Sequence, residues 1–203
     1  MLIPTLDLET QLWEKGYKVV CGVDEVGRGC FAGPVVVGAV IFSPNSRIPD
    51  GIADSKKLSI KKRIELTQKI KDSCLAYSTF TIDVPIINEI GIGKATQLAF
   101  KSLVDNLKPP PDFVLVDAFT ITDFDIVKQA AVQDGDGRCL SIAAASIIAK
   151  VYRDKLMEEL DLQYPDYQFA KHKGYGTKVH QEAIKKYGLC KLHRTSFNLQ
   201  KFI

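Results

Sequence analysis

Two β-rich runs separated by a short glycine- and proline-bearing segment constrain the fold of this chain most strongly. The first run, Lys18 to Val23, ends at the acidic residues Asp24 and Glu25, and the second run extends from Val35 to Phe42. Three glycines and a proline lie between residues 27 and 34. Turn-forming residues of this kind between two β-branched runs predict two strands joined by a tight turn.

The same turn bears on the class of ligand. Gly27 to Ala32 matches the G-x-G-x-x-A pattern of dinucleotide-binding enzymes, but that motif must open a helix. Here Pro34 and the run Val35 to Val37 open a strand, so a dehydrogenase is a distant alternative that cofactor binding would test. A turn of this kind brings bare backbone groups close to a ligand, and Arg28 can reach a phosphate. A plain tight turn is the alternative, and the neighbouring acidic pair favours ligand contact.

The rest of the chain predicts alternating strands and helices. The expected strands are Tyr77 to Val84, Phe113 to Asp117 and Ile126 to Val132, and the expected helices are Ile60 to Ser73, Gly93 to Leu107, Ser141 to Leu162 and Lys178 to Tyr187. We expect a turn at Asn88 to Gly91 and inward-facing side chains at Ile60, Ile64, Ile70, Ala95, Leu98, Ala99 and Leu103. This order predicts an α/β layered fold, with a mixed sheet that is antiparallel at its start and flanked by helices.

Length and composition are those of a soluble single-domain protein. The chain has 203 residues, and 27 Lys plus Arg against 24 Asp plus Glu give a net charge of +3. The longest apolar stretch, Gly33 to Phe42, is far shorter than the ~20 residues of a membrane helix, and the acidic N-terminal region is unlike a signal peptide. We therefore expect a cytoplasmic protein with no membrane association. The five cysteines form no CxxC pair, which favours reduced thiols and no structural zinc.

Carboxylates at the ends of the expected strands form a candidate metal site. Asp24 and Glu25 follow one strand, Asp117 closes another, and Asp136 lies in a loop before a long helix. Gathered like charges raise one another's pKa values unless a cation neutralises them. Mg²⁺ or Mn²⁺ prefers such oxygen ligands, and two ions ~3.5–4 Å apart can promote phosphodiester cleavage. The alternative, strongest for Asp117 alone, is that each acid only forms a turn.

Basic residues cluster in two regions, Lys56 to Arg63 and Lys171 to Arg194. The pI of about 8.5 is below the value of ~9 that indicates a nucleic-acid-binding domain. A charge run of this kind is usually only a solvated helix face, and a phosphate-binding surface is the alternative.

Six motifs in order resemble one known family. They are Gly22-Val23-Asp24-Glu25-Val26-Gly27-Arg28-Gly29 with Ala32-Gly33-Pro34-Val35, Asp54-Ser55-Lys56-Lys57-Leu58, Val116-Asp117, Ser141 to Asp154, Lys171-His172-Lys173-Gly174-Tyr175-Gly176-Thr177 and His193-Arg194-Thr195-Ser196-Phe197. Over residues 18 to 197 the chain resembles bacterial ribonuclease HII, the type 2 ribonuclease H.

The resemblance implies an RNase H-like mixed five-stranded sheet flanked by helices, with a small helical C-terminal portion. We expect residues 1–163 to form the catalytic domain and residues 164–203 a substrate-binding extension of it. The implied activity is endonucleolytic hydrolysis of the RNA strand of RNA–DNA hybrids, together with incision 5′ of single ribonucleotides in duplex DNA. A two-metal-ion mechanism with Mg²⁺ or Mn²⁺ would leave 3′-hydroxyl and 5′-phosphate ends.

The resemblance also assigns residues. Asp24, Glu25 and Asp117 match the family's metal-binding acids. The fourth acid is expected five residues before Ser141, at Asp136. Family members often have lysine-glycine-aspartate there, whereas this chain has Asp134-Gly135-Asp136, so Asp134 is the runner-up.

The substrate-binding residues follow in the same way. The Gly27-Arg28-Gly29 segment matches the part of the family that recognises the ribonucleotide 2′-hydroxyl, and Tyr175 matches a tyrosine that packs on the neighbouring sugar. Lys56, Lys57, Lys171, His172 and Lys173 fit phosphate contacts.

Two alternatives stay open. Type 3 ribonuclease H shares the fold and the acids but resists single-ribonucleotide substrates, and its extra N-terminal domain is not expected here. A non-catalytic nucleic-acid-binding protein would use the basic C-terminal region. We expect a monomer, and the short segment after Phe197 argues against a C-terminal clamp-binding peptide.

Overall fold

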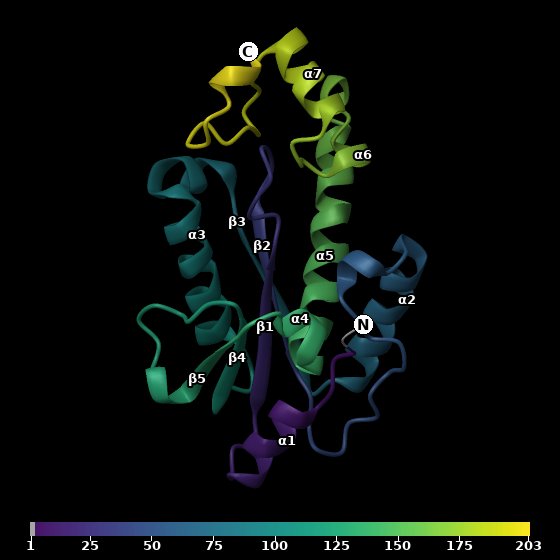
Figure 1. Cartoon of the computed structure of the whole chain (residues 1–203), viewed down its shortest axis with the longest axis vertical. Helices are drawn as coiled ribbons and strands as arrows, with labels where there is room; N and C mark the ends of the chain where they lie inside the picture. The colour runs from purple at the N-terminus through teal and green to yellow at the C-terminus, as the bar shows by residue number, and fades with distance from the viewer. Residues whose placement is uncertain (1–2) are drawn as a thin grey trace.

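The computed structural model describes residues 3–203, which form one five-stranded mixed sheet with helices on both faces (Figure 1). The strands are β1 (Val20–Val26), β2 (Val35–Ile41), β3 (Ala76–Ile82), β4 (Phe113–Asp117) and β5 (Gln129–Val132), in the spatial order β3-β2-β1-β4-β5. The expected mixed five-stranded sheet is confirmed. The fifth strand is shorter than predicted, because Ile126–Lys128 forms a 3-10 turn before it.

Strand pairing brings distant acids to one edge of the sheet. β1, β2 and β3 form an antiparallel meander, while β4 lies parallel to β1 on its other side and β5 parallel to β4. Val23 pairs with Val116 in the parallel ladder. The next residue of each strand is an aspartate, so Asp24 and Asp117 emerge side by side.

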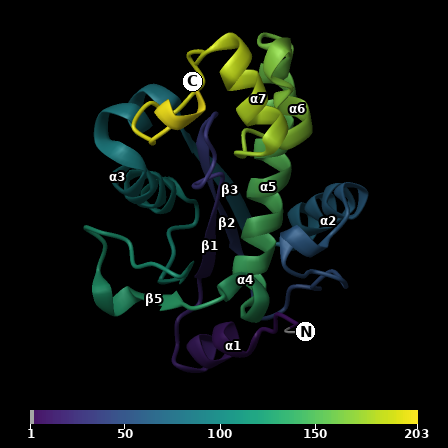
Figure 2. The same cartoon turned by 45° about the horizontal axis from the view of Figure 1, so that its top comes forward.

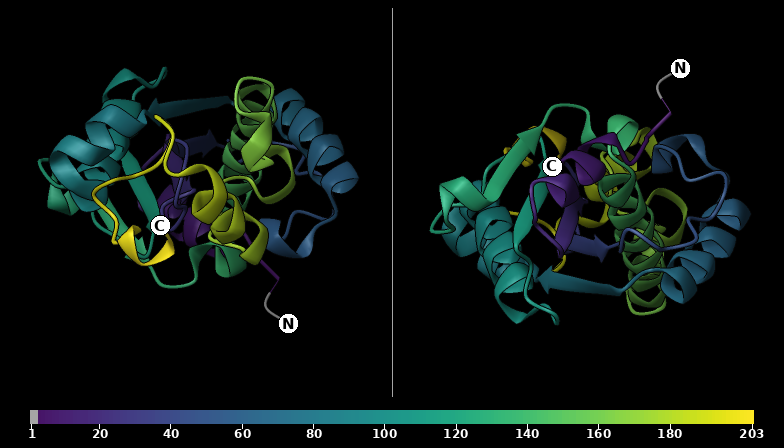
Figure 3. Two further views of the ribbon diagram at one scale, coloured as in Figure 1. Left: turned by 90° about the horizontal axis from the view of Figure 1, so that it is seen from above. Right: turned by 90° about the horizontal axis from the view of Figure 1, so that it is seen from below.

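Helices cover both faces of the sheet (Figures 2 and 3). Each face has its own hydrophobic core. The helix α3 (Val84–Asn106) covers one face, where Ala99 and Phe100 are buried against Val37 of β2. The helices α2 (Ile60–Ser73) and α5 (Leu140–Asp161) cover the other face, where Leu66 and Ile147 are buried together. No helix within residues 3–203 is long and apolar enough to cross a membrane.

Two helices differ from their expected form. In α2 the predicted inward-facing Ile60 and Ile64 are 63% and 56% exposed, because the helix turns Arg63 inward, where it donates to the carbonyl oxygens of Ser55 and Leu58. In α3 helical structure already begins at Val84 and replaces most of the expected turn, with a break at Gly91 (φ 79°). Leu98, also expected inside, is 43% exposed.

An N-terminal helix, α1 (Asp7–Glu14), is absent from the expectations and caps the start of α5. Its Glu9 is fully buried, and Glu9 Oε1 accepts a hydrogen bond of 2.8 Å from the Ser141 backbone N–H. A carboxylate at this position satisfies a donor that the helix itself leaves free.

The C-terminal segment folds over the end of the β1–β2 hairpin (Figure 1). It contains the one-turn helix α6 (Phe169–His172) and the helix α7 (Lys178–Tyr187), which the side chain of Thr177 caps. Phe169 and Tyr167 are buried with Ala32 of the hairpin turn and Met157 of α5. The proposed boundary after residue 163 stays a prediction, although α5 ends close to it.

Candidate active site

A pocket of about 210 Å³ opens where β1 and β4 end. Its walls come from the two strands, the hairpin turn, the segment before α2, the middle of α5 and the loop before α7. The lining residues are Asp24, Glu25, Val26, Gly27, Arg28, Ser55, Lys56, Asp117, Ser146, Lys150 and Tyr175. Seven of the sequence-predicted site residues are among them.

Three carboxylates form the floor of this pocket. Asp24 is 5% exposed, and its Oδ1 accepts a 2.7 Å hydrogen bond from the Glu25 backbone N–H. Asp117 Oδ1 accepts a 2.7 Å hydrogen bond from the Gly135 N–H at the start of α4 (Gly135–Arg138). Glu25, on the same strand as Asp24, is half-buried.

Burial and mutual repulsion raise the pKa values of all three acids. Desolvation, followed by the charge of Glu25, raises the pKa of Asp24 well above its usual range. Desolvation and the charge of Asp117 raise the pKa of Glu25 to about 7. The pKa of Asp117 also rises, mainly because of burial. Clustered carboxylates with raised pKa values mark a functional site rather than a stabilising ion-pair network.

The fourth acid lies at the rim of this cluster. Asp136 Oδ2 lies 3.3 Å from Lys56 Nζ, and its side chain is 13% exposed. Asp134, the runner-up, is exposed and adopts a left-handed backbone conformation just before α4. The geometry therefore places Asp136 nearer the pocket than Asp134.

The carboxylates fit an open divalent-metal site. Glu25 Oε2 is buried and has no hydrogen-bond partner, as a free ligand oxygen would be. Within residues 3–203, no three His, Cys, Asp or Glu side chains converge closely enough to enclose a metal ion. Mg²⁺ does not need such a cage, because it keeps several waters and binds through one or two carboxylates plus a substrate phosphate.

The hairpin turn and the Tyr175 loop both line the pocket and are hydrogen-bonded directly to each other. The backbone N–H groups of Phe31 and Ala32 donate to the Gly174 carbonyl oxygen at 2.9 and 3.3 Å. A Cβ at Gly174 would lie 2.2 Å from the Ala32 carbonyl oxygen, so only glycine permits this approach. Tyr175 is 40% exposed and lines the pocket.

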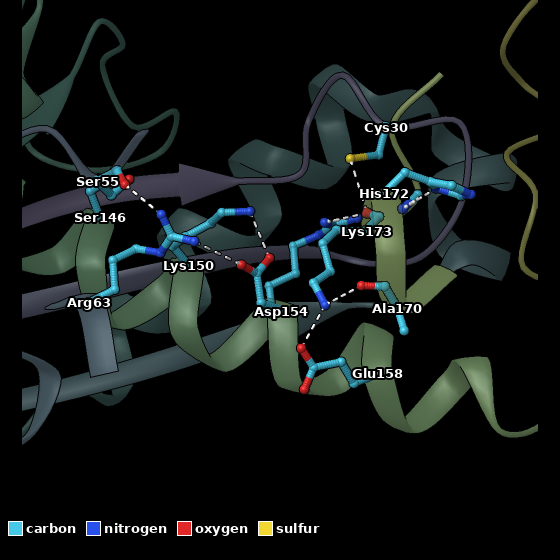
Figure 4. Close-up of polar contacts among 12 residues, drawn as sticks. Cys30, Ser55, Arg63, Ser146, Lys150, Asp154, Glu158, Ala170, His172 and Lys173 are labelled. Carbon is cyan, nitrogen blue, oxygen red and sulfur yellow. Dashed lines mark hydrogen bonds and ion pairs between the residues drawn. The ribbon is translucent and has the colours of Figure 1, made fainter. Parts of the chain in front are cut away.

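Besides Val26, three polar lining residues had no expected role: Ser55, Ser146 and Lys150 (Figure 4). The hydroxyl oxygens of Ser55 and Ser146 lie 3.0 Å apart. Lys150 Nζ contacts Asp154 Oδ1 at 2.7 Å, and the same Nζ lies 5.6 Å from the Tyr175 ring centroid. The four-residue spacing of Ser146, Lys150 and Asp154 is the signal that could have revealed this polar stripe on an otherwise buried helix.

Other predicted substrate-binding residues lie outside the pocket lining: Gly29, Lys57, Lys171, His172 and Lys173. Lys57 pairs with Asp54. Lys173 Nζ contacts Glu158 and the Ala170 carbonyl oxygen (Figure 4). His172 is buried, with Nε2 2.8 Å from the Tyr167 carbonyl oxygen and Nδ1 accepting from the Gly174 N–H. Both ring nitrogens of His172 are thus engaged by backbone, and the structure does not bring this residue to the pocket.

Comparison with known proteins identifies the family. A family model described as Ribonuclease HII matches residues 21–200. A ribonuclease HII from Caldicellulosiruptor bescii is 48% identical over 191 residues, which cover 94% of this chain and 92% of the relative. Ribonuclease H2 from Pyrococcus horikoshii OT3 has a similar structure, with a TM-score of 0.76 and 27% identity over 91% of this chain and 96% of that one.

A type 3 enzyme shares the fold at lower similarity. Bst-RNase HIII, solved in complex with Mn²⁺, has a TM-score of 0.67 and 22% identity, covering 92% of this chain and 69% of that one. The family model and the curated relative both extend over nearly the whole chain, and both carry the same description. The chain therefore belongs to the ribonuclease HII family.

Proposed function

We propose that this ribonuclease H hydrolyses the RNA strand of RNA–DNA hybrids and also incises duplex DNA on the 5′ side of a single ribonucleotide. The observation that supports the proposal is one pocket that joins an acidic floor to a glycine-bearing turn and an exposed tyrosine. The floor suits phosphodiester hydrolysis, and the two walls suit recognition of a sugar.

The acidic floor would hold Mg²⁺ or Mn²⁺ through Asp24, Glu25, Asp117 and Asp136. When bound, these ions supply an activated water and stabilise the leaving oxygen, which gives 3′-hydroxyl and 5′-phosphate ends. The Gly135 N–H fixes one oxygen of Asp117 at 2.7 Å and leaves the other free. Lys56, 3.3 Å from Asp136 and largely exposed, is placed to meet a phosphate at the rim.

The walls would supply the selectivity for RNA. The 2′-hydroxyl is both donor and acceptor, and it is what distinguishes RNA from DNA at one position. The backbone of Gly27 and Arg28 reaches the pocket with no side chain on Gly27 in the way. Tyr175 lines the same pocket and offers a ring on which the next sugar can pack.

The test compares three labelled substrates with Mg²⁺ or Mn²⁺: a DNA duplex with one ribonucleotide, the same duplex without it, and a long RNA–DNA hybrid. Incision immediately 5′ of the lone ribonucleotide supports the proposal. Cleavage of the long hybrid alone would indicate type 3 behaviour and contradict the roles of the turn and Tyr175. Binding without metal-dependent cleavage of either would indicate a non-catalytic protein.

A further inference from the structure

Two arginines are fully buried directly behind the walls of the pocket. Arg153 of α5 and Arg194 of the C-terminal segment are each 0% exposed. Within residues 3–203 neither of them forms a salt bridge with a carboxylate. Burying a charge without a counter-ion is costly, so the donors of both side chains need other acceptors. Every guanidinium nitrogen of the two residues except Arg194 Nη2 donates to a backbone carbonyl oxygen.

Arg194 binds the hairpin turn from the C-terminal side. Its Nη1 donates to the Arg28 carbonyl oxygen at 2.8 Å, and its Nε donates to the Gly33 carbonyl oxygen at 3.0 Å. The first bond fixes the peptide between Arg28 and Gly29, which belongs to the segment expected to read the ribose. The Arg194 backbone N–H also donates to the Phe31 carbonyl oxygen at 2.8 Å.

Arg153 joins the two walls. Its Nε donates to the Pro34 carbonyl oxygen at 2.9 Å and its Nη2 to that of Ala32 at 3.3 Å, both in the hairpin turn. Its Nη1 donates to the Lys173 carbonyl oxygen at 2.8 Å, two residues before Tyr175. The guanidinium carbon lies 5.9 Å from the Tyr175 ring centroid.

Gly27 and Arg153 pack without any space between them. A Cβ at Gly27 would lie 2.0 Å from Arg153 Nε, so the guanidinium occupies the volume that a side chain there would need. The turn therefore packs on Arg153. Arg153 ties the turn to the Tyr175 loop together with the direct hydrogen bonds from the Phe31 and Ala32 N–H groups to the Gly174 carbonyl oxygen.

We propose that Arg153 and Arg194 are positioning residues that set the selectivity of the pocket for a ribonucleotide. Arg153 ties the turn to the Tyr175 loop, and Arg194 fixes the Arg28–Gly29 peptide of the turn, so that both segments keep the geometry that a ribose requires. Both arginines act through backbone carbonyl oxygens rather than on the substrate. A lysine cannot replace either of them, because several carbonyl oxygens in different directions need the fixed fork of a guanidinium. This inference rests on the proposed function, since it assigns the selectivity to the same pocket.

The experiment uses Arg153→Lys and Arg194→Lys in the full chain, with the exposed Arg47→Lys as the matched control. Incision of the single-ribonucleotide duplex is measured as kcat/KM with Mn²⁺. Affinity for the all-DNA duplex is measured in EDTA, and circular dichroism and thermal unfolding report folding. Affinity for the all-DNA duplex depends on phosphate contacts and not on ribose recognition.

Each lysine variant should lower kcat/KM for the single-ribonucleotide duplex by at least about tenfold, the effect of losing a hydrogen bond to a charged group. Affinity of each lysine variant for the all-DNA duplex should stay within about twofold of wild type. Arg47→Lys should stay within about twofold of wild type both in kcat/KM and in affinity for the all-DNA duplex. If one variant fails to fold, the other still tests the proposal.

Two results would overturn the inference: a folded variant that keeps its incision of the single-ribonucleotide duplex, or losses of incision and all-DNA binding in parallel, as a general structural role would cause. A wild-type protein that does not incise at the ribonucleotide would instead refute the proposed function, and the inference with it.

Discussion

Replacing Glu25 with glutamine should stabilise the metal-free protein at alkaline pH, even though it removes a predicted metal ligand. The pKa of Glu25 rises from 4.5 to about 7 in the folded protein, first because of burial and then because of the charge of Asp117. Between these two pH values the folded state binds more protons than the unfolded state, so the free energy of unfolding falls as the pH rises. Glutamine keeps the shape of the side chain and removes this ionisation.

The size of the effect follows from the shift. A shift of about 2.5 units at 1.36 kcal/mol per unit corresponds to roughly 3 kcal/mol at pH 8. At pH 5 most of Glu25 is protonated in the folded state, and the same linkage leaves a difference of about 1 kcal/mol. For a domain of this size, 3 kcal/mol corresponds to an increase in Tm of about 6–12 °C.

The assay is urea unfolding and thermal unfolding in EDTA at pH 5, 6, 7 and 8, on wild type, Glu25→Gln and the exposed-acid control Glu14→Gln. The gap between Glu25→Gln and wild type should widen with pH, while the control follows wild type. Adding Mn²⁺ should raise the Tm of wild type more than that of Glu25→Gln, because a ligand that binds only the folded state stabilises it.

The reasoning would be refuted by a Glu25→Gln protein that is less stable than wild type at pH 8 in EDTA. A gap that is the same at pH 5 and pH 8 would also refute it, because a constant gap reports packing rather than ionisation.

Three further predictions follow from the same geometry. Asp117→Asn should reduce metal-dependent cleavage by at least about a thousandfold while leaving hybrid binding in EDTA unchanged, as gel shift and cleavage assays would show. Gly27→Ala should lower the free energy of unfolding by more than about 1 kcal/mol and impair incision, because the residue has φ +90° and its Cβ would meet Arg153; urea unfolding tests this. Burial lowers the pKa values of His180 and His193 to about 4, so the NMR signals of their rings should not titrate above pH 5. Because the folded state requires both rings to be neutral, the free energy of unfolding should fall as the pH drops from about 6.5 to 4.

The sequence predicted well those elements whose ends carry local signals. The helix α2 has the expected bounds, and it begins at Ile60 because Ser59 caps it by accepting from the Lys62 N–H. Its orientation was wrong, since the inward turn of Arg63 depends on carbonyl oxygens at Ser55 and Leu58 that periodicity does not reveal. A hydrophobic pattern places Ile60 and Ile64 in the core, but in the structure Arg63 is buried instead and the two isoleucines are exposed.

The residues of the candidate site could likewise be predicted only where local sequence signals determine them. Asp117 closes β4 as predicted, whereas Asp24 lies within β1, which continues to Val26. The proximity of the two acids depends on the parallel pairing of β1 with β4, which is not a local property. Lys150 was not predicted as a pocket residue because it lies inside a long helix, where a lysine normally indicates a solvated face. His172 stood out in a basic motif, whereas the fold buries it against Phe169 and His180.

The placement of charge explains why the acids and the buried arginines are kept apart. Arg153 and Arg194 use their donors on backbone carbonyl oxygens, although carboxylates with raised pKa values lie in the adjoining pocket. An ion pair with Arg153 would lower the pKa of Asp24 and relieve its repulsion, but it would also occupy the oxygens that a divalent cation needs. We expect that keeping each arginine on the backbone leaves the acids free for the metal that the proposed function requires, and holds the turn in place at the same time.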